Sequence, residues 1–207
     1  MEEMNRKEQD QKVFAEIEEI LLQEEVPSVR LNELSETKRF QESVFAFLNR
    51  MKKTEQSKQH HPEGNVWIHT MMVVDEAAKL REKSKEPRIF LWSALLHDLG
   101  KPDATKLRKG KITAYDHDKI GASLTKELLL QVSDDSVFID QVTAMVRWHM
   151  QILFIAKNMS MAEVETMKQE VDVNEVALLG LCDRLGRLNA NREEVKRDID
   201  KFRSTVK

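Results

Sequence analysis

Apolar residues along this chain recur mainly at intervals of three and four, the spacing that places them on one face of an α-helix. The run from Val13 to Leu21 predicts a helix that ends near Val26–Pro27. Residues 1–12, before it, are so polar that we expect them to fray in solvent. A second helix is predicted from Ser35 to Lys53, and the polar stretch Thr54–Gly64 predicts a loop.

The pattern becomes more strongly apolar after residue 65. Asn65 is suited to cap a helix, and Pro87 to the first turn of the next one. That next helix is apolar on every side from Ile89 to Leu96, which predicts the central buried helix, and Gly100 predicts its end. The other predicted elements are a hairpin within residues 103–115 that turns at Lys109–Gly110, helices from about Asp116 to Leu128, Asp135 to Met150 and Val173 to Ala190, and a charged helical tail from Asn191 to Lys207.

The composition favours an all-α fold, because six glycines and four prolines in 207 residues leave few helix breakers. A net charge of −3 gives no overall field that would attract nucleic acid or anionic lipid, so any affinity for phosphate has to come from local groups. The single Cys182 excludes an internal disulfide. The charged N-terminus and the lack of an apolar run near the ~20 residues of a membrane span predict a cytoplasmic protein with no membrane partner.

The strongest candidates for functional residues are His97 and Asp98, at the end of the apolar central helix. Two such polar groups are costly to bury unless a cation neutralises them. Further groups of this kind lie on apolar helix faces at His69 and His149, at a helix start at His117, and beside apolar residues at Asp183. A single inward histidine is ordinarily a core residue, but four histidines and two aspartates in this order favour metal ligands.

The spacing of these groups predicts either one metal ion or two. Imidazole and carboxylate ligands suit Mn, Fe, Co, Ni or Zn better than Ca, with Mg as a further option. Asp98 can bridge two ions through its separate oxygens. The predicted first site contains His69, His97, Asp98 and Asp183, and the predicted second site contains Asp98, His117 and His149.

Such a centre predicts hydrolysis of a phosphate ester by a metal-activated hydroxide. We expect Asp98 and Lys101 to be catalytic, although Lys101 is also placed to complement the helix C-terminus. Arg184, Arg187 and Arg147 are the predicted substrate-binding residues, since the guanidinium fork suits phosphate. Arg184 and Arg187 could instead be ion-pair partners.

Other polar residues are weaker candidates. We expect His60 and His61, in the polar loop, to be exposed to solvent, and Trp67 and Trp92 to be core residues. The basic turn of the predicted hairpin is ordinarily a solvated feature, but it could also contact phosphate; it contains Lys106, Arg108, Lys109 and Lys111.

Five stretches resemble the HD superfamily of metal-dependent phosphohydrolases, and more narrowly the HD domain of bacterial tRNA nucleotidyltransferases (CCA-adding enzymes). They are EGNVWIHTMMVVDEA, LLHDLGKPDATK, KGKITAYDHDKIGA, RWHM and CDRLGR, within Glu63–Arg187. The resemblance implies a helical bundle with phosphatase, nucleotidase or 2′,3′-cyclic phosphodiesterase activity. Nucleotidyl transfer needs a Gly-Ser turn and a D-x-D pair ahead of this region. The D-x-D at Asp116–Asp118 lies inside it and does not fill that role. The resemblance therefore implies only the hydrolase activity for this chain.

The resemblance and the patterning together divide the chain into three parts. Residues 1–60 are expected to form a helical extension that packs on the core, 61–190 the HD domain, and 191–207 a helical tail. The predicted substrate is a phosphorylated small molecule or nucleotide, or an RNA 3′ end. A nucleotide- or RNA-binding module that keeps its metal without turnover is the alternative. A scaffold built on a degenerate copy would bind no metal. A homodimer is compatible with the sequence.

Overall fold

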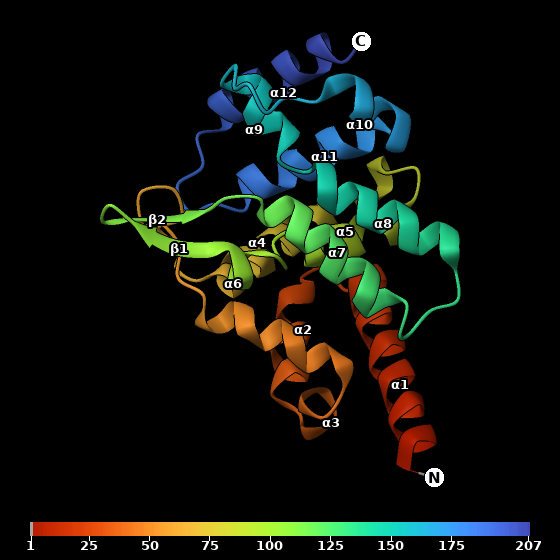
Figure 1. Ribbon diagram of the computed structural model, residues 1–207. Helices are drawn as coiled ribbons and strands as arrows, with labels where there is room; N and C mark the ends of the chain where they lie inside the picture. Colours follow the sequence, from red (N-terminus) through yellow and green to blue (C-terminus); the bar gives the residue numbers. More distant parts are fainter. Residues whose placement is uncertain (1) are drawn as a thin grey trace.

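A computed structural model describes residues 2–207, and it is mainly helical, which confirms the all-α prediction. Within those residues the only sheet is one antiparallel hairpin (Figure 1). The helices are α1 (Glu2–Gln23), α2 (Pro27–Glu36), α3 (Lys38–Gln41), η1 (Val44–Lys53), α4 (Val66–Leu80), η2 (Arg81–Lys83), α5 (Pro87–Leu96), α6 (Lys101–Ala104), α7 (His117–Leu129), α8 (Ser136–Trp148), α9 (Gln151–Ala156), α10 (Val164–Glu170), α11 (Val173–Leu185) and α12 (Arg192–Thr205); the strands are β1 (Thr105–Arg108) and β2 (Lys111–Ala114).

The centre of the molecule is α5, as its all-round apolar sequence predicts. Every residue from Phe90 to Leu96 is buried, and α5 packs against α1, α4, α8 and α11. The first helix joins this core through Phe14, whose ring stacks on Trp92 with centroids 4.9 Å apart. The indole nitrogen of Trp92 donates a hydrogen bond to Glu18 of α1 at 3.2 Å. The division of the chain into three parts stays a prediction.

The prediction for residues 1–12 is wrong over the part that the structure describes, because α1 already begins at Glu2. Met1 lies outside the described residues. Asp10 shows why the early turns are held in place: it is 5% exposed, and its Oδ1 accepts a hydrogen bond from the backbone nitrogen of Val44 at 2.9 Å.

The prediction of a single helix from Ser35 to Lys53 is also wrong. The segment is divided between the end of α2, the short α3 and the 3₁₀ helix η1. Thr37 is extended (φ −73°, ψ 148°), and its side chain accepts from the Phe40 nitrogen as an N-cap; Ser43 caps η1 in the same way. Hydroxyl side chains that bond to nearby backbone compete with a continuous helix.

Several local predictions are confirmed. The Asn65 side chain accepts from the Ile68 nitrogen and caps α4. The hairpin turns at Lys109 and Gly110, which both have positive φ. The last turn predicted for residues 173–190 is absent, since α11 ends at Leu185. The sequence patterns did not predict η2, α6, α9 or α10, nor α2 ahead of Ser35.

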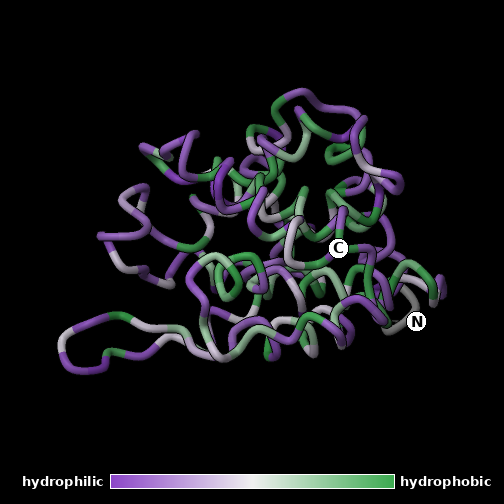
Figure 2. Tube along the Cα trace, turned by 90° about the horizontal axis from the view of Figure 1, so that it is seen from above, coloured by the Kyte–Doolittle hydropathy of each residue, from purple (hydrophilic) through white to green (hydrophobic). Residues whose placement is uncertain are grey.

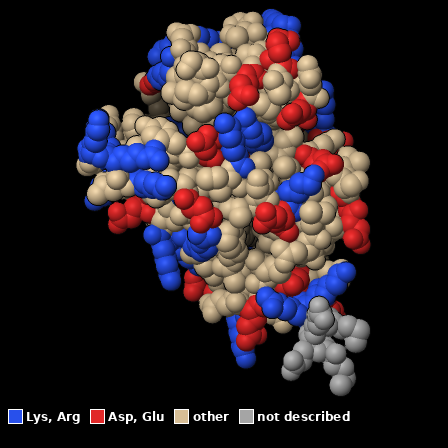
Figure 3. Space-filling view, in the orientation of Figure 1, with Lys and Arg blue, Asp and Glu red and all other residues tan. Residues whose placement is uncertain are grey.

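Four helix contacts position the candidate site: α4 and α11 both pack on α5, α8 packs on α5, and α7 packs on α8. The hairpin projects from the helical body (Figures 1 and 2). Lys and Arg side chains gather on the side where it projects (Figure 3). Between residues 2 and 207, no helix combines the length and the apolar character needed to cross a bilayer.

Candidate metal centre

His97 and Asp98 follow the last residue of α5, and each is only 1% exposed. Nδ1 of His97 lies 2.8 Å from the carbonyl oxygen of Ala94, so it carries the proton and donates it there. The other ring nitrogen, Nε2, lies 3.2 Å from Oδ2 of Asp98 and is buried without a hydrogen-bond partner among the described residues. In the neutral ring, the lone pair of Nε2 would therefore face the carboxylate.

A first group of ligand-type atoms surrounds Oδ2 of Asp98. The group draws on α4, on the end of α5 and on α11. Nε2 of the fully buried His69 lies 3.8 Å from this oxygen and 3.0 Å from Oδ1 of Asp183. His97 completes the group. Helices that pack on one another thus bring His69, His97 and Asp98 into one cluster, and Asp183 joins it through its contact with His69.

A second group faces the other oxygen of the same carboxylate. Oδ1 of Asp98 lies 3.4 Å from Nε2 of His117 and 3.9 Å from Nε2 of His149. His117 is the first residue of α7, and His149 follows α8. Their Nδ1 atoms donate to the carbonyl oxygens of Ala114 and Val146, each at 2.7 Å. Asp98 therefore lies between the two groups, with one oxygen toward each.

The donor set fits divalent transition metals. Because both Nδ1 atoms face backbone carbonyls, neutral rings of His117 and His149 would present lone pairs to each other, with their Nε2 atoms only 3.2 Å apart. Two lone pairs at that distance repel unless a cation or a proton lies between them. Ligand atoms on a tetrahedral ion at roughly 2.0–2.1 Å are about 3.3 Å apart. The buried clusters of His, Asp and Glu are consistent with binding of a divalent metal.

Electrostatics favours the ligand forms of His149, Asp98 and Asp183. His97 differs: burial alone would lower its pKa, but the neighbouring Asp98 outweighs burial and raises that pKa. Burial, together with the neighbouring His117 and His97, lowers the pKa of His149 to about 3. Burial alone would raise the pKa of Asp98, but His97 and Lys101 outweigh it and hold that pKa well below its usual range. The pKa of Asp183 is likewise held low, because Arg187 and His69 outweigh its burial.

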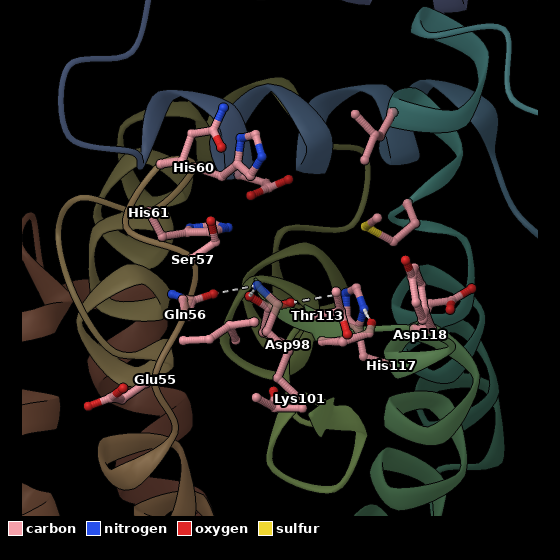
Figure 4. Close-up of a pocket in the computed structure, with 18 of the residues that line it drawn as sticks. Glu55, Gln56, Ser57, His60, His61, Asp98, Lys101, Thr113, His117 and Asp118 are labelled. Carbon is pink, nitrogen blue, oxygen red and sulfur yellow. Dashed lines mark hydrogen bonds and ion pairs between the residues drawn. The ribbon is translucent and has the colours of Figure 1, made fainter. Parts of the chain in front are cut away.

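Lys101 lies at the edge of the centre. It is 9% exposed, and its Nζ is 2.7 Å from Oδ2 of Asp98. The same ammonium donates to Oε1 of Gln56 at 2.6 Å. Figure 4 shows Asp98 between the loop that carries Gln56 and His61 and the helix that begins at His117. The ammonium is thus fixed beside the carboxylate that faces both groups.

The three predicted substrate-binding arginines differ in their surroundings. Arg187 and Arg184 line a cavity of about 1840 Å³ over the two groups, whereas Arg147 does not. Arg187 contacts both oxygens of Asp183 at 3.2 Å. The other two are engaged outside the centre: Arg184 pairs with Asp198, and Arg147 pairs with Asp118 and Glu163.

The hairpin contributes two of its basic residues to the cavity. Arg108 and Lys111 line it, and Lys106 and Lys109 do not. The guanidinium of Arg108 lies 4.7 Å from the ring centre of the exposed Tyr115. All four basic side chains are exposed.

The exposure predicted for the two loop histidines is right for His60 and wrong for His61. The His61 side chain is 11% exposed, and its Nδ1 donates to Oε1 of Glu63 at 2.9 Å. Burial lowers the pKa of His61 to about 4. Sequence analysis missed Glu63 because it lies in a loop, where no periodicity shows which side chains point inward. Bonds from His61 and His69 outweigh burial and hold the pKa of Glu63 well below its usual value.

Residues 66–188 match the family model described as "HD domain", which covers more than half of the chain. The chain belongs to the HD domain family. All five helices that carry or support the two groups of ligand-type atoms lie within the matched segment. Glu63 and His61 lie just ahead of it.

Curated relatives of this HD domain protein include multifunctional CCA proteins. One from Actinobacillus pleuropneumoniae serotype 5b is 35% identical over 96 residues, which is 44% of this chain and 22% of the relative. One from Methylococcus capsulatus is 24% identical over 157 residues, 74% of this chain and 31% of the relative. An A-adding tRNA nucleotidyltransferase from Deinococcus radiodurans is 34% identical over 64 residues, 30% of this chain and 15% of the relative. The chain thus spans less than a third of these relatives.

Proposed function

We propose that this HD domain is a metal-dependent phosphohydrolase that acts on nucleotides or RNA ends. One observation carries the proposal: the single carboxylate of Asp98 turns one oxygen toward His69 and His97 and the other toward His117 and His149. This is the arrangement that a bridging ligand of two ions needs. The six predicted ligands are His69, His97, Asp98, His117, His149 and Asp183.

A divalent cation bound there would act as a Lewis acid on a phosphoryl oxygen and lower the pKa of water, so that hydroxide is available near neutral pH. The residues of the chain prepare the site for this. The backbone carbonyls that accept from Nδ1 of His97, His117 and His149 leave each Nε2 free. Lys101 places a positive charge where negative charge on a phosphoryl group would develop.

The cavity supports a nucleotide-like substrate. Apolar residues on α9 and on either side of it line one part of the cavity and suit a nucleobase: Met150, Leu153, Phe154, Met159 and Met161. Four lining cations have no ion-pair partner among the described residues and are free to meet phosphate: Lys53, Lys58, Arg108 and Lys111. At about 1840 Å³ the cavity exceeds the 300–1,000 Å³ of typical small-ligand pockets, so a nucleotide at an RNA end also fits. The relatives include a tRNA nucleotidyltransferase, which agrees with such a substrate.

Hydrolysis by the purified, metal-loaded chain tests the proposal. The substrates are nucleoside monophosphates, 2′,3′-cyclic nucleotides, an aryl phosphate and a short RNA with a 3′-terminal phosphate. We expect turnover of at least one, loss on chelation, recovery on adding Mn²⁺ and loss in Asp98→Ala. Metal-loaded protein that binds nucleotides without hydrolysing any of them would instead favour a binding module.

A further inference from the structure

The loop before α4 places the carboxylate of Glu63 next to the candidate metal centre. The Glu63 side chain is 2% exposed. Its Oε1 lies 2.9 Å from Nδ1 of His61 and also 2.9 Å from Nδ1 of His69. Its Oε2 accepts from the backbone nitrogen of Leu188 at 3.3 Å. One buried carboxylate is therefore shared by two imidazoles, one of them in the candidate first site.

Hydrogen bonding accounts for this cluster without a third metal ion. Nδ1 of His61 donates a hydrogen bond to Oε1 of Glu63, and Nδ1 of His69 faces the same oxygen at 2.9 Å. A proton on Nδ1 of His69 would therefore point at the carboxylate, and Nε2 of that ring would face the first site, where it lies 3.0 Å from Oδ1 of Asp183.

His69 differs from the other three histidines in what faces its Nδ1. His97, His117 and His149 each donate to a backbone carbonyl three residues earlier, which substitution does not remove. Nδ1 of His69 faces the Glu63 side chain instead. The tautomer and ring orientation of His69 thus depend on a removable side chain from another segment.

We propose that Glu63 is a positioning residue that fixes the tautomer of His69 and raises the affinity of the first site for its metal. The inference rests on the proposed metal centre. A carboxylate behind a ligating imidazole increases ligand basicity, and losing such a partner typically costs about 10–100-fold in metal affinity. The same oxygen holds His61 at the cavity wall, which couples the loop over residues 54–64 to the metal centre.

Two measurements on Glu63→Ala and Glu63→Gln test the inference. Calorimetric titration with Mn²⁺ should show the tighter binding step weakened about 10–100-fold in Glu63→Ala and less in Glu63→Gln, whose amide oxygen still accepts. In the metal-free protein, ¹⁵N NMR of the histidine rings should show His69 protonated at Nδ1 in the parent and a mixture of tautomers in Glu63→Ala.

Two control variants separate this effect from general damage to the loop. Glu55→Ala removes an exposed acid from the same loop, and His61→Ala removes the other partner of Glu63. Both should keep Mn²⁺ affinity within about threefold. Unchanged affinity and an unchanged His69 tautomer in both Glu63 variants would overturn the inference. The NMR measurement needs neither metal nor turnover, so failure of the proposed hydrolase activity would be seen separately.

Discussion

Nε2 of His117 and Nε2 of His149 face each other at 3.2 Å, although the Nδ1 of each ring is already committed to a backbone carbonyl. The rings come from α7 and from the end of α8, two helices that pack together. Packing therefore holds two ring nitrogens in contact beside Oδ1 of Asp98. Between neutral rings such a contact is unfavourable in the absence of positive charge, and a bound metal ion would remove the repulsion.

Gly100→Ala should displace the second group of ligands and leave the first. A Cβ at residue 100 would lie 2.1 Å from the carbonyl oxygen of His117 and 2.5 Å from the nitrogen of Gly121. Both are backbone atoms, so α7 has to move away from Asp98. We expect a loss of about 1–3 kcal/mol in the free energy of unfolding and one bound ion fewer. Urea denaturation and metal analysis measure the two effects.

Gly110→Asn is the matched control for Gly100→Ala. Nothing lies within 4 Å of a Cβ at Gly110, and asparagine tolerates its positive φ. This variant should keep its full metal content. Full metal content and stability in Gly100→Ala would contradict the importance of this close approach.

Lys101→Met should separate catalysis from metal binding. The ammonium next to Asp98 repels a cation, so its removal should leave metal affinity unchanged or higher. Loss of a positive charge beside the reacting phosphoryl group should lower kcat by about 10²–10³-fold. Steady-state kinetics at saturating Mn²⁺ measures this. Unaltered kcat would mean that Lys101 only complements the end of the helix.

Phe14→Ala tests whether the N-terminal segment is part of the folded core. Phe14 stacks on Trp92 and lies near Phe138 and Phe45. Removing a large aromatic side chain from a core costs about 3–5 kcal/mol, and since Phe14 is only partly buried we expect about 2–3 kcal/mol. Val29→Ala, at an exposed residue of α2, is the control. An unchanged urea midpoint in Phe14→Ala would mean that α1 does not stabilise the domain.

Cys182 should report opening of α11. It is fully buried, and burial followed by the charges of Glu76 and Asp183 raises the pKa of its thiol far above the ordinary value. A folded chain at pH 8 should react with a maleimide only through opening, and Mn²⁺ should slow the reaction because Asp183 is tied to the centre. Labelling as fast as in 6 M guanidinium would contradict the buried position.

The helices around the centre could be predicted because their signals are local. Asn65 caps α4, Pro87 begins α5, and the all-apolar face of α5 identifies the buried helix. All six predicted ligands lie together in the structure, and their role as ligands stays a prediction. Five of them were indicated by a polar group within an apolar segment and His117 by its place at a helix start, signals that need no knowledge of the neighbouring helix.

Other features depended on contacts that periodicity does not show. Phe40, Phe45, Leu48 and Met51 are all buried, yet Thr37 interrupts the helix before them. Glu63 and His61 lie in a loop, and only the approach of α4 and of Leu188 buries them. The helix break at Thr37 and the burial of Glu63 and His61 therefore depend on contacts that the local sequence does not show.

A Mn²⁺ titration followed by electron paramagnetic resonance tests the central claim most directly. If Asp98 bridges two ions about 3.5–4 Å apart, the parent binds two Mn²⁺ per chain with a spin-coupled signal. His117→Ala should then bind one uncoupled ion, and Asp98→Ala should lose tight binding. A parent that binds no Mn²⁺ tightly, or one ion whose signal is unaffected by either substitution, would contradict the account.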